Sequence, residues 1–264
     1  MNSIWLMYHD VCESSPASEI PASAAAYHVS RDQFAAQIDV IRRSGRRVVT
    51  AGEFARGIKE DSVVITFDDG WRGTFDIAVP MLRQAGWPAT IFVTRDFLGR
   101  KHFADDSALR EAAAAGMEIG VHGTTHRMLS SCTKEERLWE FRACKDHHEA
   151  VLGQAVVSAS QPGGDWNAEI VAAARASGLM SLGTSRPGCN NARTDLFQLR
   201  RIAIKSTSSE ADVARFCSGQ MVPEVARWAV LQFPRRLLGM KNYSRLRRIL
   251  VDEKKGGSEE VFKP

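Results

Sequence analysis

Short apolar runs alternate with amphipathic stretches along most of the chain. The first run is Ser3–Tyr8, and similar runs occur at residues 47–50, 63–67, 89–93, 117–121, 156–160, 179–184 and 199–204. Apolar runs of this length, rich in β-branched and aromatic residues, are typical of buried strands. Their alternation with helical segments predicts an α/β domain with a parallel sheet. Seven or so repeats in a single domain favour a barrel over an open sheet.

The intervening segments carry signals for helix starts and stops. Ser30 with Gln33, and Thr133 with Glu136, have capping-box spacing, and Gly45 and Gly153 stand where those helices would stop. The other helices are expected after Thr50, at residues 74–85, from Asp106 or Ser107 to 115, from Asn167 to 177, and after Ser209. The polar, Ala/Ser/Pro-containing stretch from residue 9 to residue 29 is expected to be a loop.

Composition limits the classes of protein. With 264 residues and 44% hydrophobic content, the chain is large enough for one sizeable core. A net charge of +4 gives no argument for nucleic acid, and no apolar run reaches the length of a membrane span. Five cysteines without CxxC spacing favour a reduced environment. The N-terminal residues lack the pattern of a secretory signal, so we expect a cytoplasmic protein.

The sequence changes character near residue 220, so we expect a barrel over residues 1–220 and a basic, amphipathic helical tail over residues 221–264. Apolar residues of the tail alternate with Arg227, Arg235, Arg236, Lys241, Arg245, Arg247, Arg248, Lys254 and Lys255. One interpretation is a helix pair that packs on the barrel and keeps its basic face in solvent. The other is peripheral contact with an anionic membrane, at the inner membrane face. Nucleic acid is not expected as a partner.

Two adjacent carboxylates, Asp68 and Asp69, follow the apolar run at residues 63–67 and precede Gly70. An Asp-Gly turn is the simplest interpretation. However, neighbouring acids at a strand end repel each other, and a bound cation would offset that cost. Other predicted strands also end in polar residues: His9 and Asp10, His122 and His126, and the segment at residues 161–165. Because such ends meet at one face of a barrel, they predict a metal site with acid–base groups.

His122 and His126 are four residues apart, in the segment His-Gly-Thr-Thr-His. Glycine and two threonines are poor helix formers, so a loop is a better expectation than a helical turn. Such a pair also arises by chance. Together with Asp69 it offers two imidazoles and one carboxylate, which leaves coordination positions for water and substrate, as in catalytic metal sites.

The segments Thr66-Phe67-Asp68-Asp69-Gly70 and His122-Gly-Thr-Thr-His126 resemble the first two motifs of the polysaccharide deacetylases, the family 4 carbohydrate esterases. The resemblance extends from about residue 3 to residue 205. It implies a distorted (β/α)7 barrel with one divalent metal ion, expected to be zinc, with cobalt or nickel as alternatives. It further implies that Asp69, His122 and His126 are the metal ligands and that Asp68 is the catalytic base.

Two family features are missing. The third motif usually begins with an arginine, but the segment at residues 159–164 keeps only Pro162 and the glycines Gly163 and Gly164. The late leucine–histidine motif, which supplies the general acid, is also absent. The segment at residues 6–11 instead resembles the branch whose acid histidine lies on the first strand, which implies that His9 is the acid. Asp10 either orients the His9 ring or begins the loop.

The expected activity is hydrolysis of N-acetyl groups on an amino-sugar glycan or a lipid-linked precursor, in exopolysaccharide biosynthesis or modification. Asp68 would activate water, an N–H of Gly163 or Gly164 would bind the oxyanion together with the metal, and His9 would protonate the amine. Trp71, Trp87 and Trp166 are candidates for sugar stacking or for the core. Two alternatives remain open: a hydrolase of a non-sugar amide, and a non-catalytic carbohydrate-binding barrel.

Overall fold

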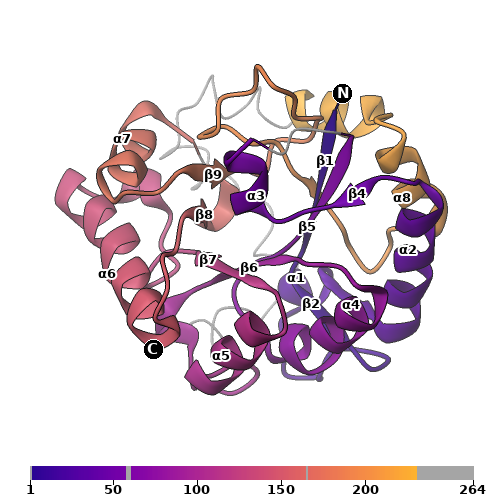
Figure 1. Ribbon diagram of the computed structural model, residues 1–264, viewed down its shortest axis with the longest axis horizontal. Helices are drawn as coiled ribbons and strands as arrows, with labels where there is room; N and C mark the ends of the chain where they lie inside the picture. The colour runs from indigo at the N-terminus through magenta and orange to yellow at the C-terminus, as the bar shows by residue number, and fades with distance from the viewer. Residues whose placement is uncertain (1, 58–60, 165, 231–264) are drawn as a thin grey trace, which may run out of the picture.

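Eight parallel strands form the central sheet of the computed structural model, which describes residues 2–57, 61–164 and 166–230 (Figure 1). The sheet contains β1 (Ser3–Tyr8), β4 (Arg47–Val48), β5 (Ser62–Phe67), β6 (Thr90–Val93), β7 (Glu118–Val121), β8 (Ser158–Ser160), β9 (Ser181–Gly183) and β10 (Ile202–Ala203). Their order is β10-β1-β5-β6-β7-β8-β9, with β4 paired to β5. All ladders between these strands are parallel, as the alternating sequence predicted.

The sheet curls because the segment just before β10, at one end of the strand order, also pairs with β9, at the other end. The backbone N–H of Leu199 donates to the carbonyl of Leu182 (3.1 Å), and the N–H of Thr184 donates to the carbonyl of Leu199 (2.8 Å). The segment that enters β10 therefore pairs with β9, while β10 itself pairs with β1. This arrangement is a distorted barrel, which confirms the predicted fold class.

Helices surround the sheet and follow the predicted segments closely. They are α2 (Arg31–Arg43), α3 (Ala51–Ala55), the π-helix η1 (Thr74–Ala78) that continues into α4 (Val79–Ala85), α5 (Asp106–Ala114), α6 (Lys134–Leu152), α7 (Ala168–Ala176) and α8 (Glu210–Cys217). Thr133 and Glu136 form the expected capping box. At α2 only half of the box forms, because the Gln33 side chain donates to the carbonyls of Lys205 and Ser208. Asp105, not Asp106 or Ser107, caps α5.

The segment expected to be a loop contains a second, two-stranded sheet. In it β2 (Asp10–Cys12) pairs in parallel with β3 (His28–Ser30), and the short α1 (Ala22–Ala25) lies between them. Each strand has three residues, too few to show an alternating pattern. The prediction of an irregular segment was therefore wrong for these residues.

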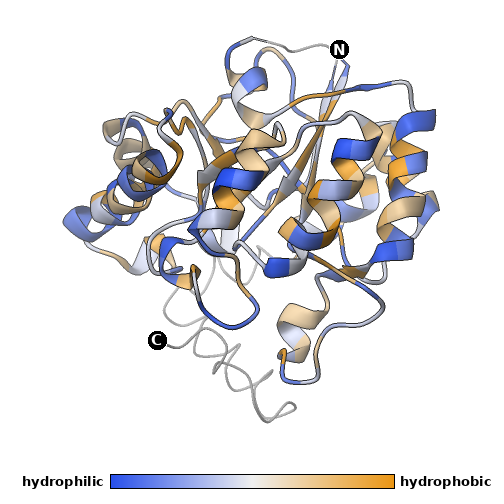
Figure 2. Ribbon diagram, turned by 60° about the horizontal axis from the view of Figure 1, so that its bottom comes forward, coloured by the Kyte–Doolittle hydropathy of each residue, from blue (hydrophilic) through white to orange (hydrophobic). Residues whose placement is uncertain are grey.

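The two faces of the central strands pack into different clusters. Ile4 and Ile65 join the large core that also contains residues of α2 and α8, whereas Trp5, Val64 and Phe92 pack together with Leu199. The outer surfaces of the helices carry most of the hydrophilic residues (Figure 2). Because apolar side chains occupy both faces of the strands, the polar chemistry is confined to the strand ends.

Only the first part of the predicted tail lies within the described residues, as a helix at residues 222–230. The remaining part, residues 231–264, lies outside them. No described helix has the length and hydropathy needed to cross a membrane.

Candidate active site

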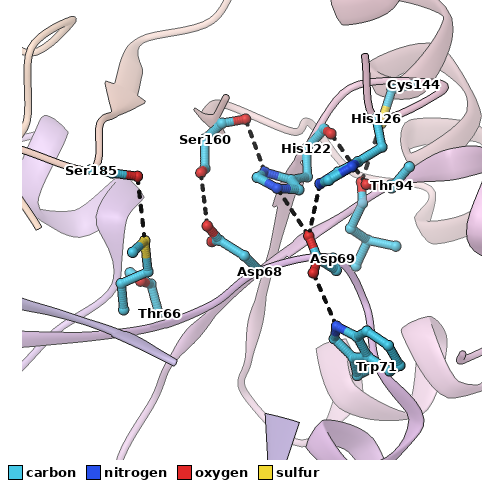
Figure 3. Close-up of polar contacts among 12 residues, drawn as sticks. Thr66, Asp68, Asp69, Trp71, Thr94, His122, His126, Cys144, Ser160 and Ser185 are labelled. Atoms are coloured by element: carbon cyan, nitrogen blue, oxygen red, sulfur yellow. Dashed lines mark hydrogen bonds and ion pairs between the residues drawn. The ribbon is translucent and has the colours of Figure 1, made fainter. Parts of the chain in front are cut away.

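Three side chains converge at the carboxyl ends of β5 and β7 (Figure 3). Oδ1 of Asp69 lies 3.1 Å from Nε2 of His122 and 3.1 Å from Nε2 of His126. Within the described residues this is the one cluster of three or more His, Cys, Asp or Glu side chains whose ligand atoms all lie within 4.8 Å of one another. Asp69 and His122 are buried, whereas the side chain of His126 is 28% exposed, which opens the cluster to solvent.

The backbone at this cluster is strained where it presents ligands. Asp69 has φ 76° and His126 has φ 63°, both in the left-handed region that residues with a Cβ seldom adopt. Gly70 follows at φ 92°, and a Cβ there would lie 2.9 Å from Cγ1 of Val93. Strain of this kind costs about 1–3 kcal/mol per residue and concentrates at functional sites. The fold holds these two residues in place at that cost.

Neighbouring groups fix the orientation of the converging side chains. Nε1 of Trp71 donates to Oδ2 of Asp69 (2.9 Å), and Nδ1 of His122 lies 3.2 Å from the Ser160 carbonyl oxygen. Oδ1 of Asp69 and Nε2 of His122 therefore face the open side. Burial would raise the pKa of the Asp69 carboxyl, but the two imidazoles hold it well below its ordinary value. Two imidazole nitrogens and an ionised carboxylate fit a divalent metal ion with open positions.

Asp68 does not join this cluster, because its carboxylate pairs with the buried guanidinium of Arg201. Nη1 of Arg201 donates to Oδ1 of Asp68 (2.7 Å), and Nη2 donates to Oδ2 (2.8 Å). The hydroxyl of Ser160 also donates to Oδ2 (3.2 Å). Burial alone would raise the pKa of the Asp68 carboxyl, but the charge of Arg201 lowers it below its ordinary value. Asp68 is thus held ionised and in one orientation.

Arg201 is the residue that sequence reasoning missed. It lies just before β10, and its Nε donates to the Thr184 carbonyl oxygen (3.0 Å) while its Nη2 donates to the hydroxyl of Ser160 (2.6 Å). It therefore holds the Asp68 carboxylate and the Ser160 hydroxyl in one arrangement. The available signal was a pair of arginines, Arg200 and Arg201, between Leu199 and Ile202 in an apolar run, which is unusual for a buried strand.

The predicted acid, His9, lies at the end of β1 near the same carboxylates. Its side chain is partly exposed, and its buried Nδ1 has no hydrogen-bond partner among the described residues. Burial lowers the pKa of His9, while the charges of Asp69 and Asp68 act in the opposite direction. The ring centroid of His9 is 4.6 Å from that of Tyr27.

Asp10 contacts a different histidine from the one expected. Its Oδ2 lies 3.2 Å from Nδ1 of His28, and its Oδ1 accepts from the hydroxyl of Thr74 (3.4 Å). His28 in turn packs edge-on against Trp71, with ring centroids 4.6 Å apart. Asp10 therefore supports Trp71, the aromatic residue that donates to Asp69, because β2 pairs with β3 where a loop was expected.

Gly163 and Gly164 form a tight turn after β8, with φ values of 67° and 65°. The N–H of Gly164 donates to the Gln161 carbonyl oxygen (3.1 Å). A Cβ on Gly163 would lie 2.4 Å from Sδ of Met128, and one on Gly164 would lie 2.1 Å from Oγ of Ser185. The turn thus needs both glycines, and it packs closely against two neighbouring loops. Pro162, just before them, is buried.

A carboxylate on α6 holds the loop that carries the two histidines. Glu140 is buried, and its Oε2 accepts from the N–H groups of Thr124 (2.7 Å) and Thr125 (2.9 Å). Its Oε1 accepts from the hydroxyl of Thr125, and its backbone carbonyl accepts from the hydroxyl of Thr124 (2.9 Å). Residues 123–126 are therefore fixed to α6, which no sequence pattern predicts.

The three tryptophans named as candidates for sugar stacking lie in different environments. Trp71 is 1% exposed and contacts Asp69, and Trp87 is partly buried against the main core beneath the guanidinium of Arg42. Trp166 is 37% exposed, and its indole N–H donates to the Phe197 carbonyl oxygen (3.2 Å). Of these three, Trp166 offers an accessible ring.

Comparison with known proteins finds similar sequences and similar folds. The polysaccharide deacetylase family matches the chain over residues 55–182. A curated relative, the putative polysaccharide deacetylase YxkH of Bacillus subtilis (strain 168), is 26% identical over 205 residues. These cover 75% of this chain and 70% of the relative.

Solved structures share the fold. The Streptococcus pyogenes deacetylase PplD, solved in complex with acetate, superposes with a TM-score of 0.73 at 21% identity, and the match covers 82% of this chain and 98% of that one. A de-N-acetylase from Aggregatibacter actinomycetemcomitans gives a TM-score of 0.71 at 17% identity, covering 82% of this chain and 100% of that one. At these identities the likeness concerns the fold.

Proposed function

We propose that this chain is a metal-dependent N-deacetylase of amino-sugar glycans, since residues 55–182 match the polysaccharide deacetylase family. One observation carries the proposal. Oδ1 of Asp69 lies 3.1 Å from Nε2 of His122 and 3.1 Å from Nε2 of His126. The neighbouring carboxylate of Asp68 pairs with the buried Arg201. The first set can hold a cation, and the second can accept a proton next to it.

Asp69, His122 and His126 would hold one divalent ion, for which we propose zinc, with cobalt or nickel as alternatives. When bound, such an ion polarises an acetyl carbonyl and acidifies water. Trp71 and the Ser160 carbonyl keep the ligand atoms turned toward the open side. The partly exposed His126 lies where substrate can approach.

Asp68 acts as the general base in this proposal. Its place in the chain, next to Asp69, puts it beside the attacking water. Arg201 keeps it ionised and prevents it from turning toward the cation, while Oδ1, which accepts one hydrogen bond from Arg201, retains a lone pair for the incoming proton. The adjacent carboxylates therefore have separate partners and separate tasks.

His9 is proposed to give a proton to the departing amine. It directly follows β1, which pairs in register with β5, the strand that Asp68 and Asp69 follow. For the oxyanion, the N–H of Gly163 is the better candidate, since the N–H of Gly164 already donates to Gln161. Trp166 is proposed as a sugar-stacking surface because its ring is accessible.

The proposed substrate is an N-acetylated amino-sugar polymer or its lipid-linked precursor, within exopolysaccharide biosynthesis or modification, at the cytoplasmic side of the membrane. Two names support the substrate class. The curated relative is named as a polysaccharide deacetylase, and one of the solved structures is named as a de-N-acetylase.

The test is acetate release from N-acetylglucosamine oligomers by the full chain, loaded in turn with zinc, cobalt or nickel. We expect release with at least one metal and its loss after chelation. Acetate release that persists in the metal-free protein would refute the metal dependence. No release with any of the three metals would refute the proposed substrate class.

A further inference from the structure

Two polar side chains that the proposed mechanism does not use are buried side by side in the small β2–β3 sheet. Asp10 on β2 and His28 on β3 are direct register partners, and Oδ2 of Asp10 lies 3.2 Å from Nδ1 of His28. Burying such a pair costs desolvation free energy that two apolar side chains would not cost. The contacts of the pair indicate what it does for the protein.

The ring of His28 packs on the indole of Trp71. The ring centroids are 4.6 Å apart, and the planes are nearly perpendicular, at 75°. Nε2 of His28 is buried and has no hydrogen-bond partner among the described residues. Phe103 stacks on the same indole at a centroid distance of 4.4 Å, with an angle of 30° between the planes. Because Trp71 is buried and interiors are close-packed, these two rings leave the indole little freedom to move.

The segment that follows Trp71 packs directly on β2. The hydroxyl of Thr74 donates to Oδ1 of Asp10 (3.4 Å). A Cβ on Gly73 would lie 2.1 Å from the Val11 carbonyl oxygen, so glycine is needed for this close approach. The small sheet therefore holds Trp71 in two ways, since β2 fixes the backbone after it and β3 contacts its side chain.

The indole N–H in turn occupies one oxygen of a proposed metal ligand (Figure 3). Nε1 of Trp71 donates to Oδ2 of Asp69 (2.9 Å), while Oδ1 faces Nε2 of His122 and of His126, at 3.1 Å from each. Asp69 has a left-handed backbone at φ 76°, a conformation that surrounding contacts must maintain. Because the N–H fixes the plane of the carboxylate, a displaced indole would also displace Oδ1.

We propose that Asp10 and His28 are positioning residues of the metal site, which act through Trp71 on Asp69. Asp10 fixes the ring of His28, His28 fixes the indole, and the indole N–H keeps Oδ1 of Asp69 turned toward the ion. The inference rests on the metal site of the proposed function. It adds to that site two residues on the small sheet, neither of which is a proposed ligand or acid–base group.

A double-mutant cycle in zinc affinity tests the proposal with the full chain, by competition with a chromogenic chelator and without reference to acetate release. Trp71→Phe keeps an aromatic ring and removes the N–H, so we expect zinc affinity to fall about 10–100-fold. His28→Asn keeps an amide that can pair with Asp10 and removes the ring against the indole, so we expect a fall of about 10-fold. If His28 acts through Trp71, the double variant should bind zinc as Trp71→Phe does.

Asp10→Asn is the second variant, because it keeps the size of the side chain and removes the charge that faces His28. It should lower zinc affinity about 10-fold, again without adding to the effect of Trp71→Phe. The matched control is His147→Asn, which breaks another histidine–aspartate contact, between Nε2 of His147 and Oδ1 of Asp106 (3.0 Å). This control should bind zinc as the original chain does.

Losses that add in the double variants, or an equal loss in the control, would overturn the proposal, because His28 would then act on the fold in general. Normal zinc affinity in His28→Asn and Asp10→Asn would also overturn it. Should His28→Asn fail to fold in a thermal melt, the cycle with Asp10→Asn decides the question. If the original chain itself binds no zinc, the proposed metal dependence fails, which is a different result from normal binding in the variants.

Discussion

A carboxylate taken out of water needs a compensating charge, and the two carboxylates at the end of β5 obtain theirs from different sources. Asp68 has Arg201, with both guanidinium nitrogens at hydrogen-bond distance, and Asp69 has the two imidazoles. Removing one member of a buried pair typically costs about 3–5 kcal/mol, because the other is left charged and alone. Arg201 is therefore both a structural partner of Asp68 and the group that determines its orientation.

The substitution Arg201→Lys tests this positioning. Lysine keeps the charge but cannot donate two parallel hydrogen bonds, so we expect kcat to fall roughly 100-fold while bound metal stays the same. Steady-state kinetics and metal analysis measure the two effects. The neighbouring Arg200 is exposed, and Arg200→Lys should leave both quantities unchanged. A normal kcat in Arg201→Lys would show that two-point contact with Asp68 is dispensable.

At the scale of elements, α6 does more than cover the sheet. It presents Glu140 to the loop at residues 123–126, and one carboxylate accepts two backbone N–H groups and a hydroxyl. His126, at φ 63°, belongs to this loop. A carboxylate that accepts several hydrogen bonds is a strong acceptor, so α6 helps to fix one of the proposed metal ligands.

Glu140→Gln should loosen that loop. The amide oxygen of glutamine can still accept from the two N–H groups, but its NH2 cannot accept from the Thr125 hydroxyl as Oε1 does, and the negative charge is lost. We therefore expect metal affinity to fall by about 10–100-fold. Competition with a metal chelator measures this affinity without reference to activity. Glu135→Gln, at an exposed position on the same helix, is the control and should have no effect. Unchanged affinity in Glu140→Gln would remove α6 from the metal site.

At the scale of the whole molecule, the sequence predicted the barrel because its strands are short, buried on both faces and separated by helices with clear caps. It also predicted that Asp69, His122 and His126 come together, as their positions after β5 and β7 imply. Arg201 could not be assigned, because its partner lies 133 residues away and closure of the sheet brings the two together. For Asp10, which was expected either to orient the His9 ring or to begin a loop, the contact with His28 could not be anticipated because three-residue strands leave no pattern.

The metal ligands come from two strands that pair through β6, so a bound ion should tie them together and stabilise the fold. At a metal concentration about 100 times Kd, the stabilisation is about 2.7 kcal/mol, which corresponds to a rise in Tm of roughly 5–10 °C. Calorimetry with and without chelator measures it. Asp69→Asn should abolish the shift, whereas His102→Gln, which removes a histidine paired with Glu19, should retain it. A shift that survives in Asp69→Asn would place the metal elsewhere.

The most direct measurement is acetate release from N-acetylglucosamine oligomers by Asp68→Asn, with metal content determined on the same sample. The account predicts full metal occupancy and a loss of kcat of about 100-fold or more, because Asp69 and the histidines remain but the base is gone. Asparagine has nearly the same size but leaves the buried charge of Arg201 without its partner, at a cost of about 3–5 kcal/mol, so a thermal melt on the same sample must show that the variant is folded. Activity close to that of the original chain, at full metal occupancy, would contradict the assignment of Asp68 as the base and with it the proposed division of labour between the two aspartates.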